Sequence, residues 1–211
     1  MARSYRLYWT PTSGSFVVEL MLREAGAPHE TIRVEDRRAP DFLAVNPLGK
    51  VPVLELPDGS VMTESAAMVL QLFEAYPAAD FTPQGAESWA RARRWLMFLT
   101  CELYTAYQQS YHSEHFTVGN RIAREEVKSA GRGRVRELWK IFETQALDPG
   151  PFVLGERYSG VDAYAAMLAS WDQSPEVLLT IRPKLGRLVQ AVCDRPETAA
   201  VLEKYKLGFG A

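Results

Sequence analysis

Two short stretches of the sequence carry groups that could hold a small peptide. The first is Asn46–Leu54 (NPLGKVPVL), which turns and then enters an expected strand across the Val51–Pro52 bond. Because proline cannot donate a ladder hydrogen bond, this bond is expected at the start or the edge of a strand. A cis bond there would leave the N–H and C=O of Val51 pointing outward, where a short peptide can pair with them like an added strand.

The second stretch is Glu64–Ser65, at the expected start of a helix. It offers a carboxylate, a hydroxyl and the N–H groups of a helix N-terminus, which suit the ammonium and carboxylate ends of an amino acid. The two stretches together predict a small-peptide site. The more ordinary interpretation of Glu64, as a solvated carboxylate that complements the helix dipole, stays open beside it.

The elements that must position these residues follow from hydrophobic periodicity. Residues 4–9 alternate as in a strand, and residues 10–15 form a turn-rich loop. Ser15 is expected to cap a helix over residues 16–25, which ends at a left-handed Gly26. Strands are also expected at residues 30–34, 51–56 and 60–63, and a helix at residues 65–76. Residues 36–45 are expected to be irregular. This order predicts a small α/β domain over residues 1–78.

Residues 77–85 have the composition of a linker, and the strand pattern disappears after them. Apolar residues at helical spacing predict long helices over about 89–110 and 122–142, although Gly131 and Gly133 interrupt the second. Close helix packing or a ligand would explain these glycines. Ser159 and Asp162 form a capping-box pattern before a helix through Trp171, and shorter helices are expected at 183–193 and 197–207. The second domain is therefore predicted as all-helical, over residues 86–211.

The composition excludes several classes of function. The formal net charge is -2, so the sequence has no basic footprint for nucleic acid and no polybasic membrane anchor. Cys101 and Cys193 are the two cysteines, without metal-ligand spacing, which fits a reducing compartment. No apolar run approaches a membrane span, and no leader peptide is visible at the N-terminus. We expect a cytoplasmic protein.

In the order and spacing of these motifs the chain resembles the cytosolic glutathione S-transferases of bacterial type. The likeness covers nearly the whole chain and rests on the NPLGKVPVL loop, the Glu64–Ser65 pair, the α/β unit followed by helices, and the segment 155–162 (GERYSGVD). It implies a thioredoxin-like α/β N-terminal domain followed by an all-α domain, a cis bond at Pro52, a homodimer, and glutathione held in the N-terminal domain.

The resemblance also implies roles for single residues. Val51, next to Pro52, would pair its backbone with the cysteinyl moiety of glutathione. Glu64 and Ser65 would hold the γ-glutamyl end, and Lys50 would reach the glycyl carboxylate. No metal is expected.

The chemistry would require glutathione as a thiolate, which a hydroxyl donor in the loop after the first strand would stabilise. Gly14 stands where the beta-class pattern has cysteine, which excludes a mixed disulfide with that residue. Ser13 aligns best with the theta-like serine pattern. Trp9 falls at the tyrosine position of the mu-like pattern, and Tyr8 is one place off, on the opposite face of a strand. We therefore rank Ser13 first as the donor and Ser15 second, with Tyr8 third. The ordinary alternatives are a helix cap for Ser15 and a solvated turn residue for Ser13.

The region that borders the electrophile site in the family carries an aromatic cluster, Tyr104, Tyr107, Tyr111 and His112. The plainer interpretation is that two of the tyrosines pack in the core and the histidines lie at the surface. His112 and His115 have a spacing that metals tolerate, but a third ligand is missing from the pattern.

The expected function is a glutathione S-transferase that conjugates the thiolate to a small, mostly apolar electrophile. Two alternatives stay open, a non-catalytic or regulatory glutathione-binding protein and a glutathione-dependent peroxidase or etherase.

Overall fold

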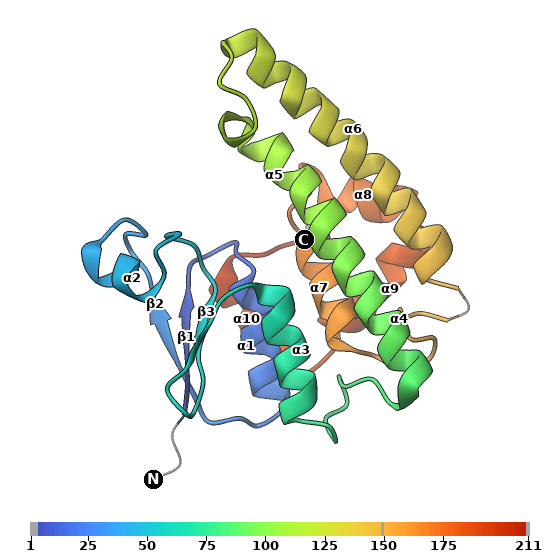
Figure 1. The fold of residues 1–211 in the computed structure, drawn as a ribbon. Coiled ribbons are helices and arrows are strands. Elements are labelled where there is room, and N and C mark those ends of the chain that lie inside the picture. Colours follow the sequence, from blue (N-terminus) through green and yellow to red (C-terminus); the bar gives the residue numbers. More distant parts are fainter. Residues whose placement is uncertain (1–3, 149, 210–211) are drawn as a thin grey trace. The chain divides into compact units, whose positions relative to one another are not determined.

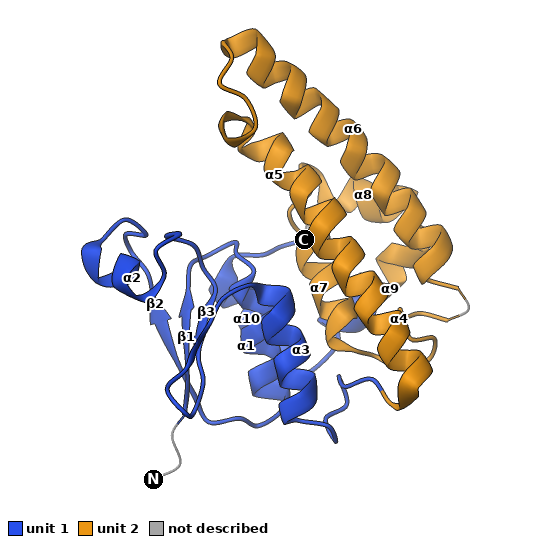
Figure 2. Cartoon of the chain, viewed as in Figure 1, with its two compact units in different colours: residues 1–83, 190–211 blue, residues 84–189 orange. Residues whose placement is uncertain are grey.

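The computed structural model of the chain describes residues 4–148 and 150–209, which cluster into two compact units. One unit contains the chain up to Pro83 together with the residues from Gln190 onward, and the other contains Gln84–Val189 (Figure 2). The second unit is built from helices, and the first contains the sheet, so the predicted fold class is confirmed. Compact units need not coincide with domains, and the limits 1–78 and 86–211 stay a prediction.

The sheet of the first unit is mixed, with the strand order β2-β1-β3-β4. Its strands are β1 (Tyr5–Trp9), β2 (His29–Arg33), β3 (Val53–Glu55) and β4 (Val61–Met62) (Figure 1). Strand β1 runs parallel to β2 and antiparallel to β3. This is the βαβ unit followed by a hairpin that the sequence predicts, with β3 beginning after Pro52 because proline cannot join the ladder.

Alternation along β1 separates the two faces of the sheet. Trp9 is buried against Tyr205 in α10 (Thr198–Tyr205), with ring centroids 4.9 Å apart. Tyr8, its neighbour, packs with Phe42 of α2 (Pro40–Val45) on the opposite face. Helix α2 lies in the segment that the sequence predicts as irregular, because six residues are too few for helical periodicity to show.

Helices α1 (Ser15–Glu24) and α3 (Ser65–Ala75) pack against each other beside the sheet (Figure 1). The predicted cap of α1 is wrong, because Gly14 occupies the N-cap position and no side chain caps the helix. Ser15 is already helical, and its hydroxyl bonds elsewhere. Gly26 has φ 61°, which confirms the predicted left-handed residue.

The second unit opens with one continuous helical run of three segments, α4 (Gly85–Met97), η1 (Phe98–Tyr104) and α5 (Thr105–Tyr111). The predicted long helix is thus confirmed, while the π-helical geometry of η1 has no sequence signal. A 3₁₀ turn, η2 (Ser113–His115), follows, and then α6 (Arg121–Ala146). A Cβ at Gly131 would lie 2.8 Å from the Ser110 nitrogen, so close packing of α5 and α6 explains this glycine.

Helix α7 (Gly160–Ala169) is buried along its whole length and begins with the predicted capping box of Ser159 and Asp162. Helix α8 (Pro175–Ile181) is not predicted from the sequence, whereas α9 (Pro183–Cys193) has the predicted bounds. None of the helices in the described part of the chain is long and apolar enough to cross a membrane.

Candidate functional site

The NPLGKVPVL loop is shaped by the side chain of its first residue. The Asn46 amide donates to the Lys50 carbonyl at 2.7 Å and accepts from the Leu48 N–H at 3.2 Å. Gly49 has φ 62°, and a Cβ there would meet the Arg37 carbonyl oxygen at 2.7 Å. Both the backbone angle and the space therefore require glycine at this position.

The bond between Val51 and Pro52 is cis, as the resemblance implies. Pro52 is buried, Val51 is half-buried, and Lys50 is exposed. Within residues 4–148 and 150–209, the N–H and C=O of Val51 have no hydrogen-bond partner. They are available to the backbone of an extended peptide, as β-strand addition requires.

Glu64 stands at the N-cap position of α3 with φ 67° and ψ 105° and an exposed side chain. A non-glycine residue in such a conformation costs on the order of 1–3 kcal/mol, and residues of this kind cluster at ligand sites. Its backbone carbonyl accepts from the Met68 N–H at 3.0 Å, which closes the first turn of α3. Ser65, the first helical residue, is buried. The side chain of Glu64 does not cap the helix.

Gly14 joins these stretches to the loop that follows β1. A Cβ at Gly14 would lie 3.3 Å from the Ser65 hydroxyl oxygen and 3.4 Å from Pro52 Cδ. The N-terminal ends of α1 and α3 therefore meet beside the cis-proline. Two helix N-termini at one point favour a negatively charged group there, such as a thiolate or a carboxylate.

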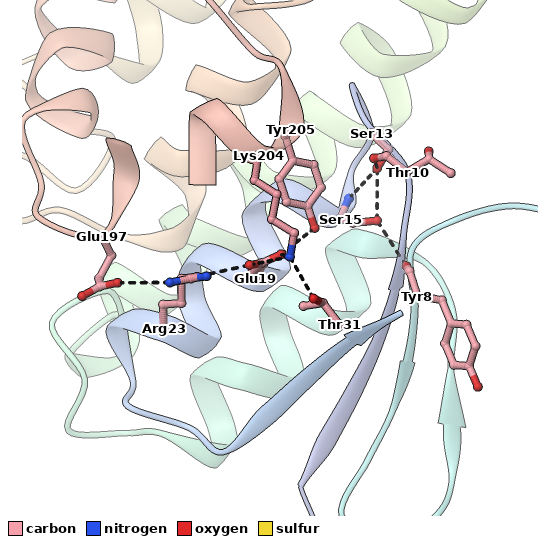
Figure 3. Close-up of polar contacts among 10 residues, drawn as sticks. All are labelled: Tyr8, Thr10, Ser13, Ser15, Glu19, Arg23, Thr31, Glu197, Lys204 and Tyr205. Atoms are coloured by element: carbon pink, nitrogen blue, oxygen red, sulfur yellow. Dashed lines mark hydrogen bonds and ion pairs between the residues drawn. The ribbon is translucent and has the colours of Figure 1, made fainter. Parts of the chain in front are cut away.

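The three predicted thiol donors occupy different environments. Ser13 is 9% exposed, and its hydroxyl donates to the Thr10 carbonyl at 2.7 Å and lies 3.1 Å from the Ser15 hydroxyl oxygen. Ser15 is fully buried and donates to the Tyr8 carbonyl at 3.3 Å. Figure 3 shows the two serine hydroxyls together, with the Tyr8 ring pointing away from them. Of the two serines that flank Gly14 in the sequence, Ser13 is thus the less buried.

The predicted electrophile-site residues all lie in the second unit. Tyr107 is buried and its hydroxyl accepts from Trp139 Nε1 at 2.9 Å and lies 3.4 Å from an Asp172 carboxylate oxygen. Tyr104 is half-buried, with its ring 5.0 Å from that of Trp171, and Tyr111 is exposed. One of the three tyrosines is therefore a core residue, whereas the plainer interpretation of the sequence expects two. The exposed His112 lies 3.5 Å from Glu114.

Tyr107 and Tyr111 contribute to a cleft of about 160 Å³ between α5, α6 and α8. Burial and the neighbouring Asp172 raise the pKa of both phenols, so each remains protonated at neutral pH. The residues that line the cleft do not include Tyr104 or His112. In the described part of the chain, no three His, Cys, Asp or Glu side chains form a metal-binding group.

Sequence reasoning missed the structural roles of two residues that shape the first unit's site. Gly14 is needed for close approach, but its neighbours Ser65 and Pro52 are distant in sequence. Thr12 has φ 52°, a backbone angle that no local sequence pattern predicts for a threonine. Its N–H donates to the carbonyl of Tyr205, close to the C-terminus.

Comparison with known proteins agrees with the resemblance to glutathione S-transferases. Residues 15–74 match the family described as "Glutathione S-transferase, N-terminal domain". The crystal structure of a glutathione transferase homologue from Sulfitobacter with bound glutathione is 27% identical, with a TM-score of 0.88, and the match covers 96% of this chain and 98% of that one.

Two curated relatives from Escherichia coli span the full length as well. Glutathione S-transferase GstA of strain O157:H7 is 24% identical over 203 residues, which is 93% of this chain and 96% of the relative. The uncharacterised GST-like protein YncG of strain K12 is 26% identical over 208 residues, covering 96% and 98% respectively.

Proposed function

Because the chain belongs to the glutathione S-transferase family, we propose that it is an enzyme that adds the thiolate of glutathione to small, mostly apolar electrophiles. The observation that carries this proposal is the meeting of Gly14, Pro52 and Ser65 where two helices begin. This place combines a backbone edge that can pair with a peptide and a positive electrostatic environment for its charged groups.

In the proposed complex, the cysteinyl backbone of glutathione pairs with Val51, next to Pro52. Glu64 and Ser65 hold the ammonium and carboxylate of the γ-glutamyl end, and the exposed Lys50 reaches the glycyl carboxylate. The charges are complementary, since glutathione carries one ammonium group and two carboxylates.

The reaction requires the thiolate form. A free thiol has a pKa of about 8.5 and is only a few per cent ionised at neutral pH. Lowering this pKa by about two units requires roughly 2.7 kcal/mol of thiolate stabilisation. A hydrogen bond from Ser13 and the adjacent helix N-termini would supply it. The thiol proton passes to solvent, the sulfur attacks the electrophilic carbon, and the leaving group departs or the electrons move into the acceptor.

One observation favours a second function. The Ser13 proton already binds the Thr10 carbonyl at 2.7 Å, so the hydroxyl must rotate before it can donate to sulfur. A protein in which this rotation does not occur would bind glutathione without activating it, as in the non-catalytic alternative. A peroxidase or etherase would use the same thiolate as the transferase. We place the protein in the cytoplasm as a homodimer by analogy with its family.

The test has two stages. The protein is first passed over immobilised glutathione, and the ultraviolet absorbance of the bound thiolate is then titrated against pH. Binding with a lowered thiol pKa supports the enzyme, binding with an ordinary pKa supports the non-catalytic protein, and no binding contradicts both.

A matched pair of serine variants locates the site. Ser65→Ala is expected to weaken glutathione binding roughly ten- to a hundredfold, because a hydrogen bond to a charged group contributes about 1.5–3 kcal/mol. Ser60→Ala removes an exposed hydroxyl that bonds Asp58 in the β3–β4 hairpin and should leave the affinity unchanged. Equal affinities in the two variants would place the γ-glutamyl end elsewhere.

A further inference from the structure

A fully buried carboxylate lies at the centre of the first unit. The side chain of Glu19 in α1 has 0% exposure, yet it lies within 3.2 Å of the donors of three other side chains. Lys204 Nζ approaches its two oxygens at 2.9 and 2.7 Å, the Tyr205 hydroxyl donates at 3.0 Å, and Arg23 Nε donates at 3.2 Å. Figure 3 shows these groups converging on Glu19 from α1 and from α10.

Lys204 uses its remaining donor on the sheet. Its Nζ donates to the Thr31 hydroxyl in β2 at 2.9 Å and lies 4.5 Å from the centroid of the Trp9 ring in β1. The cluster of Glu19, Lys204 and Tyr205 (the Glu19 cluster) therefore fixes α10 against α1, β1 and β2. Burial and the Glu19 charge raise the pKa of the Tyr205 phenol, which keeps it a donor.

The end of α10 is attached to the loop that carries Ser13. The carbonyl of Tyr205 accepts from the Thr12 N–H at 2.9 Å. This carbonyl belongs to the last turn of α10, where carbonyl groups have no partner within the helix. Thr12 has φ 52°, a conformation that a threonine keeps only when its surroundings impose it. Before the loop, the Trp9 ring packs on the Tyr205 ring. On the other side of Ser13, the Phe16 ring of α1 lies edge-on to the same ring, with centroids 6.0 Å apart.

The loop is thus held on both sides of Ser13 by one short helix that the Glu19 cluster fixes in place. We infer that Glu19, Lys204 and Tyr205 are positioning residues, which set the geometry of the Thr10–Ser15 loop so that the Ser13 hydroxyl and the start of α1 face the glutathione sulfur. This inference rests on the proposed function and adds to it a dependence on residues near the C-terminus that touch no substrate.

The test compares two variants that each remove a cation from a glutamate of α1. Lys204→Met keeps the aliphatic stem and removes the donors to Glu19. Arg195→Met removes the guanidinium that bonds Glu24 and Asp80 at 2.5 and 3.1 Å, two carboxylates outside the Thr10–Ser15 loop. Both variants are expected to lower the melting temperature, so melting alone does not separate them.

The first readout does not involve glutathione. The amide of Thr12 is expected to exchange its hydrogen about tenfold faster in Lys204→Met than in Arg195→Met, because its acceptor is no longer fixed. The second readout is the thiol pKa of bound glutathione, expected to rise by about one unit in Lys204→Met alone. The affinity for S-methylglutathione, which has no thiol to ionise, should match the wild type in both variants.

Equal Thr12 exchange in the two variants, or an unchanged thiol pKa in Lys204→Met, would overturn the inference. A wild-type protein that binds glutathione with an ordinary thiol pKa would instead overturn the proposed function, and the Thr12 exchange rates would still decide whether the Glu19 cluster holds the loop. If Lys204→Met does not fold, Tyr205→Phe removes a single hydroxyl from the same carboxylate, and a smaller change in the same direction is expected.

Discussion

At the residue scale, the proposed thiol donor is Ser13, a neighbour of Gly14 that is 9% exposed, whereas Ser15 on the other side of Gly14 is fully buried. Ser13→Ala should raise the thiol pKa of bound glutathione and lower kcat/KM roughly ten- to a hundredfold. The reason is the loss of one charge-assisted hydrogen bond, which contributes about 1.5–3 kcal/mol. Steady-state kinetics with a reactive aromatic electrophile and a pH titration of the bound thiolate measure both effects.

Ser15→Ala is the matched control. It removes a fully buried hydroxyl that donates to the Tyr8 carbonyl. Its expected cost is about 1 kcal/mol of unfolding free energy with kcat/KM nearly unchanged. Tyr8→Phe should also leave the thiol pKa unchanged, because the ring lies on the other face of β1. A larger catalytic loss in either control than in Ser13→Ala would transfer the donor role to that residue.

At the element scale, the contact between α5 and α6 depends on a missing side chain. A Cβ at Gly131 would lie 2.8 Å from the Ser110 nitrogen and 3.0 Å from the Ala106 oxygen, and these are backbone atoms that cannot rotate away. Gly131→Ala should therefore destabilise the protein by about 1–3 kcal/mol, despite the higher helix propensity of alanine. Urea unfolding followed by circular dichroism measures the change.

Gly133 lies two residues away in the same helix and offers the opposite case. The nearest atom to a Cβ there is 4.0 Å away, at the end of the Arg136 side chain. Gly133→Ala should stabilise the protein by about 0.5–1 kcal/mol, because alanine costs less backbone entropy in a helix. If both alanines changed stability in the same direction, helix packing would not be the reason for Gly131.

The start of α7 carries a pH-dependent contribution to stability. Asp162 is fully buried, and burial raises its pKa to about 7, although its oxygens accept from the N–H groups of Val153 and Ser159. The folded state therefore keeps a proton that the unfolded state releases above its ordinary pKa of about 4. The contribution of Asp162 to the free energy of unfolding is highest below about pH 4 and falls as the pH rises toward 7.

Asp162→Asn tests this sign. The variant should be less stable at low pH by roughly 1–3 kcal/mol, because one oxygen replaces two acceptors. Its stability should then change less than the wild type's between pH 5 and 7.5 in urea unfolding. Asp148→Asn, at an exposed carboxylate, should keep the wild-type slope. If the stability of the wild type rose between pH 5 and 7.5 by more than that of the variant, folding would lower the pKa of Asp162 and not raise it.

At the scale of the whole molecule, the sequence predicted the elements that have a strong period and the sites that have a strong motif. The long helices, the β1–α1–β2 unit and the capping box of α7 follow from local patterns that the packing reinforces. The segments that were missed, α2 and α8, are six and seven residues long, and such short helices carry too few apolar positions to show a period.

The candidate site was predicted in its parts but not in its connections. The cis bond at Pro52 and the helix start at Ser65 came from motifs and family likeness. The approach of Gly14 to both, and the bond between Thr12 and Tyr205, join residues about 40 to 190 positions apart. Such contacts depend on how the elements pack, and a single sequence carries no pattern for them.

Helix α10 illustrates this dependence of the first unit on the far end of the chain. A chain that ends at Pro196 loses Lys204 and Tyr205, so that among the side chains the structure describes only Arg23 still bonds the buried Glu19. Breaking a buried ion pair by removing one partner typically costs 3–5 kcal/mol. For a protein of this size that corresponds to a drop in melting temperature of roughly 10 °C, which calorimetry would detect.

Adding Glu19→Gln to the shortened chain should restore part of the loss, because a neutral amide is less costly to bury. A shortened chain that melts at the wild-type temperature would show that α10 contributes little to the stability of the unit.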